Sequence, residues 1–149
     1  MVGLTFKQEH EDGLVGLTKT RTTRFNLEYQ LKMAGYDKEE IADILRRSEW
    51  GPVECPARGE RRLHLWLGSP RQMHRWSWIR KLGISKPRYI IDAVKGRDFT
   101  EKMALEDGFG TVQEFKKALM ELHEGLTMAT VERHTWVSFR IDWEEGPHA

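Results

Sequence analysis

Apolar and polar residues alternate in several short stretches of the chain, and this period predicts β-strands. The pattern is clear in residues 61–68, where Leu63, Leu65 and Leu67 alternate with Arg62, His64 and Trp66. Further strands are predicted in residues 2–6, 19–25, 71–83, 87–94 and 129–143. Residues 51–60 hold two prolines and two glycines and are predicted to form a loop.

A helical period appears in two parts of the chain. Residues 25–35 have near-helical apolar spacing and stop at Gly35, and residues 37–50 begin with Asp37 and Glu40 at the spacing of a capping box. These two helices predict a hairpin at about 25–50. A short helix is expected after Thr100, and residues 111–125 form the clearest helical pattern.

The order of these elements indicates the fold class. The strands do not alternate one-for-one with helices, so a parallel doubly wound sheet is not expected. We expect an α+β fold built on a mixed β-barrel, with a helical-hairpin insertion at about 25–50 after the second strand. The 149 residues fit a single domain spanning 1–149.

Composition narrows the class of protein further. Apolar residues make up 39% of the chain and charged residues 32%, which is typical of a globular protein. No apolar run approaches the ~20 residues of a membrane span, and no secretory signal is expected at the start. Cys55 is the single cysteine of the sequence, so we expect no internal disulfide and a cytoplasmic location.

Charge is unevenly distributed along the chain. The net charge is +1, but residues 46–97 carry +9, against −2 before them and −6 after them. The same middle section holds Trp50, Trp66, Trp76 and Trp78. Cations interleaved with aromatic rings are typical of proteins that bind single-stranded nucleic acid. The alternative is a core of tryptophans beneath a solvated basic face.

Several kinds of chemistry find no support in the sequence. No pair of histidines has the spacing of a helical metal site, and the cysteine stands alone, so no metal site is expected. Phosphate-binding glycine loops and a dinucleotide fingerprint are also absent, so no cofactor is expected. A serine nucleophile elbow is not present either.

The stretch KTRTTR, residues 19–24, carries the strongest local signal. A lysine with a lowered pKa can take the proton of a threonine hydroxyl, so a Lys–Thr pair is able to perform acyl transfer on an amide. The alternative is a strand that contacts phosphate or solvent. On a strand, Thr20, Thr22 and Arg24 would share one face, and Lys19, Arg21 and Thr23 would lie on the other.

Four segments in order resemble the ASCH (activating signal cointegrator homology) domain family, which has a PUA-like β-barrel. They are DGLVGLTKTRTTR, GERRLHLWLG, DFTEKMALEDGFGTVQEFKKAL and HTWVSFRIDW, and the resemblance covers residues 1–24 and about 59–143. One branch of this family is similar to small bacterial amidohydrolases that deacetylate N(4)-acetylcytidine.

The resemblance implies a set of site residues. Carried over by position, Lys19 would be the base, Thr22 the nucleophile and Asp107 the assisting carboxylate, with Arg24 positioning the substrate. Asp107 stands where the family has glutamate, and neighbouring Glu106 competes for that role. The remaining substrate-binding candidates are Thr20, Arg21, Glu106, Trp66 and Trp76.

Other ASCH and PUA-like proteins are thought to bind RNA or read modified bases, and this is the function we favour from the sequence. The expected partners are RNA, single-stranded nucleic acid or a modified nucleoside, and no membrane. Such a base would stack on a ring from Trp66, Trp76, Trp78 or Trp136. Amidohydrolysis of an acylated nucleoside is the alternative. A helix-turn-helix that begins at Gly35 is a minor alternative, since Pro52 and Pro56 interrupt its second helix.

Overall fold

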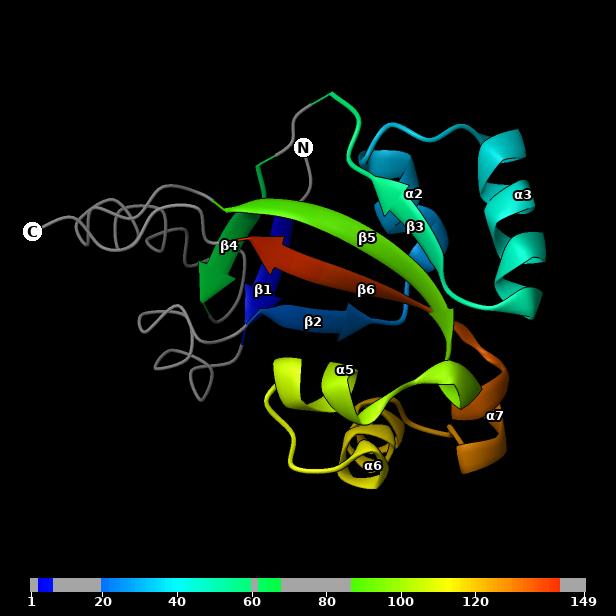
Figure 1. Ribbon diagram of the computed structural model, residues 1–149, viewed down its shortest axis with the longest axis vertical. Helices are drawn as coiled ribbons and strands as arrows, with labels where there is room; N and C mark the ends of the chain where they lie inside the picture. The colour runs from blue at the N-terminus through cyan, green and yellow to red at the C-terminus, as the bar shows by residue number, and fades with distance from the viewer. Residues whose placement is uncertain (1–2, 7–19, 60–61, 68–86, 143–149) are drawn as a thin grey trace, which may run out of the picture.

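The computed structural model of the chain describes residues 3–6, 20–59, 62–67 and 87–142. These residues form an α+β fold, as expected. A four-stranded antiparallel sheet lies between two groups of helices, with α2 and α3 on one side and α5, α6 and α7 on the other (Figure 1). A smaller sheet of two strands lies beside one end of the large one (Figure 1).

The large sheet has the strand order β2-β6-β5-β3. Its strands are β2 (Arg21–Arg24), β3 (Val53–Pro56), β5 (Arg88–Lys95) and β6 (Thr135–Asp142). The small sheet pairs β1 (Gly3–Phe6) in parallel with β4 (His64–Leu67). An isolated antiparallel bridge between Arg62 and Arg88 connects the two sheets. Closure of the strands into a barrel stays a prediction.

The predicted helical insertion lies between β2 and β3. It consists of α2 (Leu27–Met33), α3 (Lys38–Arg47) and the 3₁₀ turn η2 (Ser48–Trp50). The capping box is confirmed, because the Asp37 side chain accepts from the Glu40 N–H while the Glu40 side chain accepts from the Asp37 N–H. Gly35 ends α2 with φ at 102°, a left-handed conformation that glycine adopts without steric cost.

The opposite face of the sheet is covered by the segment that connects β5 to β6. This segment contains η4 (Gly96–Asp98), α5 (Glu101–Glu106), α6 (Val112–Leu122) and α7 (Met128–Arg133). Thr100, Thr111 and Thr127 cap the three helices through side-chain oxygens, so the first two predicted starts are confirmed. Gly96 packs against α7 so closely that an added Cβ would lie 2.0 Å from the carbonyl oxygen of Val131.

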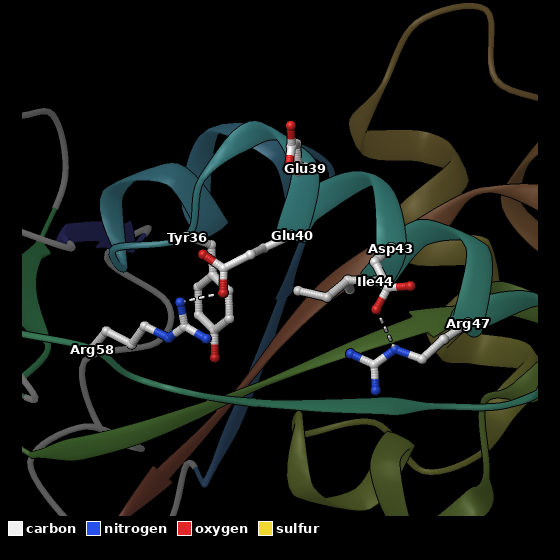
Figure 2. A pocket seen from close by; sticks show the side chains of 7 residues that line it. All are labelled: Tyr36, Glu39, Glu40, Asp43, Ile44, Arg47 and Arg58. Carbon is white, nitrogen blue, oxygen red and sulfur yellow. Dashed lines mark ion pairs between the residues drawn. The ribbon is translucent and has the colours of Figure 1, made fainter.

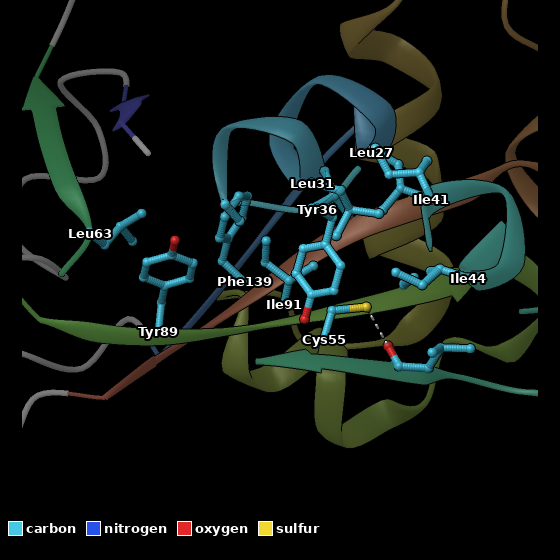
Figure 3. Close-up of a cluster of buried hydrophobic side chains, with 14 of the residues drawn as sticks. Leu27, Leu31, Tyr36, Ile41, Ile44, Cys55, Leu63, Tyr89, Ile91 and Phe139 are labelled. Carbon is cyan, nitrogen blue, oxygen red and sulfur yellow. Dashed lines mark hydrogen bonds between the residues drawn. The ribbon is translucent and has the colours of Figure 1, made fainter. Parts of the chain in front are cut away.

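The first hydrophobic core lies between the sheet and the hairpin. Leu27, Leu31, Tyr36, Ile41 and Ile44 of the hairpin segment pack onto side chains of the sheet that include Ile91 and Phe139 (Figure 3). Cys55 lies in this core with 1% of its surface exposed, and burial raises the pKa of its thiol to about 11. The thiol is therefore protonated at neutral pH and chemically inert.

The second core lies between the sheet and helices α5 to α7. Trp136, a candidate for base stacking, is fully buried here, and its indole N–H donates to the carbonyl oxygen of Val131 at 2.9 Å. The ring of His134 stacks on Phe25 at 3.9 Å between centroids and edges onto Trp136. Nε2 of His134 donates to the carbonyl oxygen of Phe25 at 2.8 Å, which identifies the protonated ring nitrogen. Trp136 therefore serves the core and not a pocket.

Two local predictions are wrong. Residues 51–60 are not all loop, since Val53–Pro56 form β3 at the edge of the sheet, where proline is tolerated because a ladder donor is not required. Val131 lies in α7 and not in the last strand, because Thr127 starts a helix that ends only at Arg133. The predicted strand at 71–83 lies outside the described residues.

Candidate functional site

The described part of the KTRTTR stretch forms β2, an edge strand whose partner is β6. Arg21 lies opposite Arg140 and Thr23 opposite Ser138, while Thr22 lies opposite Phe139. Since side chains alternate along a strand, Thr22 and Arg24 belong to the face that α2 and α3 cover, and Arg21 and Thr23 to the other. The predicted division of faces is therefore correct for these four residues.

The end of α5 lies against the start of β2. The backbone N–H of Thr20 donates to the carbonyl oxygen of Glu106 at 3.3 Å, and Nη2 of Arg21 lies 3.6 Å from Oε1 of Glu106. Asp107 is the C-cap of α5 and interacts electrostatically with Arg24. The structure thus brings together two segments that lie more than eighty residues apart in the sequence.

Cations are well placed at this helix end. The carbonyl end of a helix carries partial negative charge, so two carboxylates there are unfavourable unless positive groups offset them. Arg21 and Arg24 supply that charge from the neighbouring strand. Burial lowers the pKa of the Arg24 guanidinium, and the carboxylate of Asp107 acts in the opposite direction. Arg24 stays cationic at any physiological pH.

Arg21 also belongs to a buried ionic network on its face of the sheet. Its Nη1 donates to Oδ2 of Asp92 at 3.0 Å and to the hydroxyl of Ser138 at 2.9 Å. Nε of Arg140 lies 2.8 Å from Asp92, and Arg140 extends the network to Glu54 at 2.7 Å. Sequence reasoning missed this network, although an aspartate inside the apolar stretch YIIDAV was a usable signal.

Thr22 lies beside the guanidinium of Arg24. Nε of Arg24 donates to Oγ1 of Thr22 at 3.3 Å, and Thr22 has 4% of its surface exposed. A hydroxyl that accepts from a cation is better able to carry developing negative charge. This local arrangement is compatible with a hydroxyl that binds a ligand or reacts with one.

A carboxylate oxygen of Glu106 is buried without a hydrogen bond among the described residues. The atom is Oε1, which has only the longer contact to Arg21, and the Glu106 side chain is 24% exposed. Buried acceptors are normally satisfied, and an unsatisfied one is a place to look for a ligand donor. Glu106 therefore becomes the stronger binding candidate of the two neighbouring acids.

Other candidates lie outside the described residues. They are Lys19, the proposed base, and Trp76 and Trp78, two proposed stacking rings. Trp66 lies on β4, opposite Thr5 in the parallel register, and its side chain is not among those described.

A separate pocket of about 290 Å³ lies against α3. Figure 2 shows Arg58 over the ring of Tyr36, and Cζ of Arg58 lies 4.2 Å from the ring centroid. Arg58 also forms an ion pair with Glu40. Asp43 and Arg47 form a second ion pair at 3.0 Å (Figure 2). The charged groups that line this pocket largely neutralise one another, so the pocket is poorly suited to bind a charged ligand.

No group of three or more histidine, cysteine, aspartate or glutamate side chains among the described residues could hold a metal ion. No helix in the described segments is long and apolar enough to cross a membrane.

Comparison of the chain with protein-family models, with curated proteins and with solved structures found no match. The junction of β2 and α5 is therefore the candidate site from which we infer a function.

Proposed function

We propose that the chain is an ASCH-type protein with a PUA-like barrel that recognises RNA or a modified nucleobase in a pocket lined by Lys, Thr and Arg. The observation that carries this proposal is the buried Oε1 of Glu106, which lacks a hydrogen bond beside Arg21. A carboxylate that accepts from an exocyclic amine, next to guanidinium donors, complements the edge of cytosine. Cytidine and its derivatives are accordingly the proposed ligand class.

The test is binding of free nucleosides by calorimetry. Cytidine is expected to bind more tightly than uridine, because uridine offers a carbonyl where cytidine offers the amine. Glu106→Gln is expected to weaken cytidine binding by about tenfold or more, since the lost bond involves a charged acceptor. Glu121→Gln, at a 63% exposed side chain on α6, is the matched control and is expected to have no effect. Equal affinity for the two nucleosides, or an unchanged Glu106→Gln variant, would refute the proposal.

Longer RNA supplies a second measurement. Phosphate contacts make affinity fall with salt, by about tenfold between 50 and 200 mM for only a few contacts. A flat salt response would argue against nucleic acid as the partner and would leave a free nucleoside as the ligand.

Amidohydrolysis of N(4)-acetylcytidine is the second candidate, and the hydrogen bond from Arg24 to Oγ1 of Thr22 supports it. In this reaction, neutral Lys19 would take the Thr22 proton as Oγ1 attacks the acetyl carbon. The C–N bond would break, the amine would leave with a proton, and water would release acetate from Thr22. Release of cytidine by the wild type and its loss in Thr22→Ala and Lys19→Ala would support this reaction. Lys117→Ala, at an exposed lysine on α6, is the control. Turnover that survives both substitutions would exclude these roles.

A further inference from the structure

Trp50 is exposed over 91% of its surface, at the end of η2. The other large apolar side chains that are exposed in the described part of the chain do not exceed 63%. An indole buries roughly 150–250 Å² when it packs, so leaving it in water gives up a large stabilisation. Packing in the hydrophobic core therefore does not account for the position of Trp50.

The two residues that precede Trp50 are held by hydrogen bonds and an ion pair. The hydroxyl of Ser48, which is fully buried, donates to the carbonyl oxygen of Leu45 at 2.6 Å and lies 3.0 Å from Oγ1 of Thr135. Glu49 pairs with Nζ of Lys95 at 2.8 Å, and its carbonyl oxygen accepts from Arg97 at 2.8 Å. The indole thus projects from a backbone segment that these contacts hold in place.

Four cationic side chains lie on the segments next to the backbone that carries Trp50. Arg46 and Arg47 form the last turn of α3 with side chains 75% and 56% exposed, and Lys95 and Arg97 approach from the end of β5 and from η4. The carboxylates that these four cations contact are those of Asp43 and Glu49. With Asp98 of η4 also counted, four cations stand against three acids, so these segments carry a small excess of positive charge and expose the side chains of Arg46, Arg47 and Arg97.

This surface is separate from the β2–α5 junction. The turn η2 leads into β3, at the opposite edge of the sheet from β2 (Figure 1). The strand register puts Val53 in one row with Ala93, Val137 and Arg24, the last residue of β2. Arg21, in contrast, lies in line with Arg140 and Ile90 towards the other end of the strands. A ligand that reaches both places must be longer than one nucleotide.

We propose that Trp50 and the arginines around it form a second contact surface for single-stranded nucleic acid. One base stacks on the indole while Arg46 and Arg97 meet the backbone phosphates, as aromatic platforms in positive grooves do. The inference deepens the proposed function and rests on it, since it names where a strand longer than one nucleotide is held. The helical hairpin then contributes to ligand binding as well as to the hydrophobic core.

An exposed ring beside exposed arginines fits single-stranded nucleic acid at this place. Tryptophan and arginine are also enriched in protein interfaces, so the binding experiment includes an outcome for a protein partner. A phosphate backbone uses those cations and a base uses the ring, so one ligand class accounts for both features.

The experiment measures binding of a labelled uridine oligomer of about 12 nucleotides by fluorescence anisotropy, at 50 to 200 mM salt. Uridine is chosen because the β2–α5 pocket is expected to prefer cytidine. Trp50→Ala is expected to weaken binding by about fivefold or more, and Trp50→Phe by less, because a phenyl ring still stacks. Tyr29→Ala, at an aromatic side chain on α2 that is 59% exposed, is the matched control and is expected to bind as the wild type does.

A cation variant tests the phosphate contacts. Arg46→Gln is expected to lower the slope of log affinity against log salt by about 0.7, the value of one phosphate on a single strand. Lys117→Gln, on α6 with a similarly exposed side chain, is expected to leave the slope unchanged.

The outcomes distinguish the second contact surface at Trp50 from the pocket proposed at the β2–α5 junction. Oligomer binding that Trp50→Ala leaves intact, or no oligomer binding by the wild type, overturns the second surface whatever the nucleosides do. A dimer that Trp50→Ala dissociates, with no effect on the oligomer, overturns it as well. Oligomer binding that depends on Trp50, when no nucleoside binds the wild type, supports the second surface and refutes the pocket.

Discussion

Asp92 links two arginines inside the sheet, and its replacement by asparagine tests how much that link stabilises the fold. Asp92 and Arg21 have side chains that are 14% and 6% exposed, and Oδ2 lies 3.0 Å from Arg21 and 2.8 Å from Arg140. The asparagine side chain would keep the shape but leave a buried guanidinium with less opposing charge. Breaking a buried pair costs about 3–5 kcal/mol when nothing else compensates.

Compensation here is partial. Arg21 keeps Glu106 at 3.6 Å and the Ser138 hydroxyl at 2.9 Å, and Arg140 keeps Glu54. We therefore expect Asp92→Asn to lower the free energy of unfolding by about 2–3 kcal/mol. For a chain of this length, that corresponds to a Tm lower by about 5–10 °C. Urea unfolding followed by far-UV circular dichroism gives the first quantity and thermal unfolding gives the second.

Asp43→Asn is the matched control. Asp43 also pairs with two arginines, Arg46 and Arg47, but its side chain is 42% exposed and theirs more so. Solvent screens such pairs, so the expected loss is below about 1 kcal/mol. Equal losses in the two variants would refute the reasoning, because burial is the main difference between them. Adding Arg21→Met to Asp92→Asn should recover stability, since the uncompensated cation is then gone.

Two further predictions concern the second core. Burial lowers the pKa of His134, so the folded state favours the neutral ring; stability is full above the unfolded pKa of about 6.5 and falls as pH drops below it. Urea unfolding at several pH values should show a smaller acid loss in His134→Gln, and an identical loss in both proteins would count against this role. Gly96→Ala is expected to cost about 1–3 kcal/mol or more, because its Cβ would lie 2.0 Å from the Val131 carbonyl oxygen. Gly110→Ala meets only a flexible side chain at 3.0 Å and should unfold close to the wild-type midpoint.

Local signals predicted much of the secondary structure. Helix starts at Asp37, Thr100 and Thr111 were predictable because a capping side chain acts within three residues of itself. Strand β3 was not predictable because Pro56 argues against a strand unless that strand lies at a sheet edge. That placement is decided by pairing with β5, far along the chain.

The candidate site was predictable only in part. The resemblance associated the β2 stretch with the acids at the end of α5, and the structure places Glu106 beside Arg21. Neither periodicity nor composition could show that Trp136 is buried and Trp50 exposed, because both follow from which helices cover the sheet. The contacts of Arg21 with Asp92 and Glu106 could not be predicted either, because they depend on strand register.

The position of β6 in the sheet has a consequence for the order in which the protein forms during its synthesis. β6 is the shared neighbour of β2 and β5, yet it comes last of these strands along the chain. The Arg21–Arg24 strand leaves the ribosome more than a hundred residues before the strand it pairs with, Thr135–Asp142. Until then its hydrogen-bonding edge has no partner in the large sheet. Nascent chains that stop before Thr135 would therefore lack the pairing of β2 with β6, and long-range closure of this pair should make folding slow.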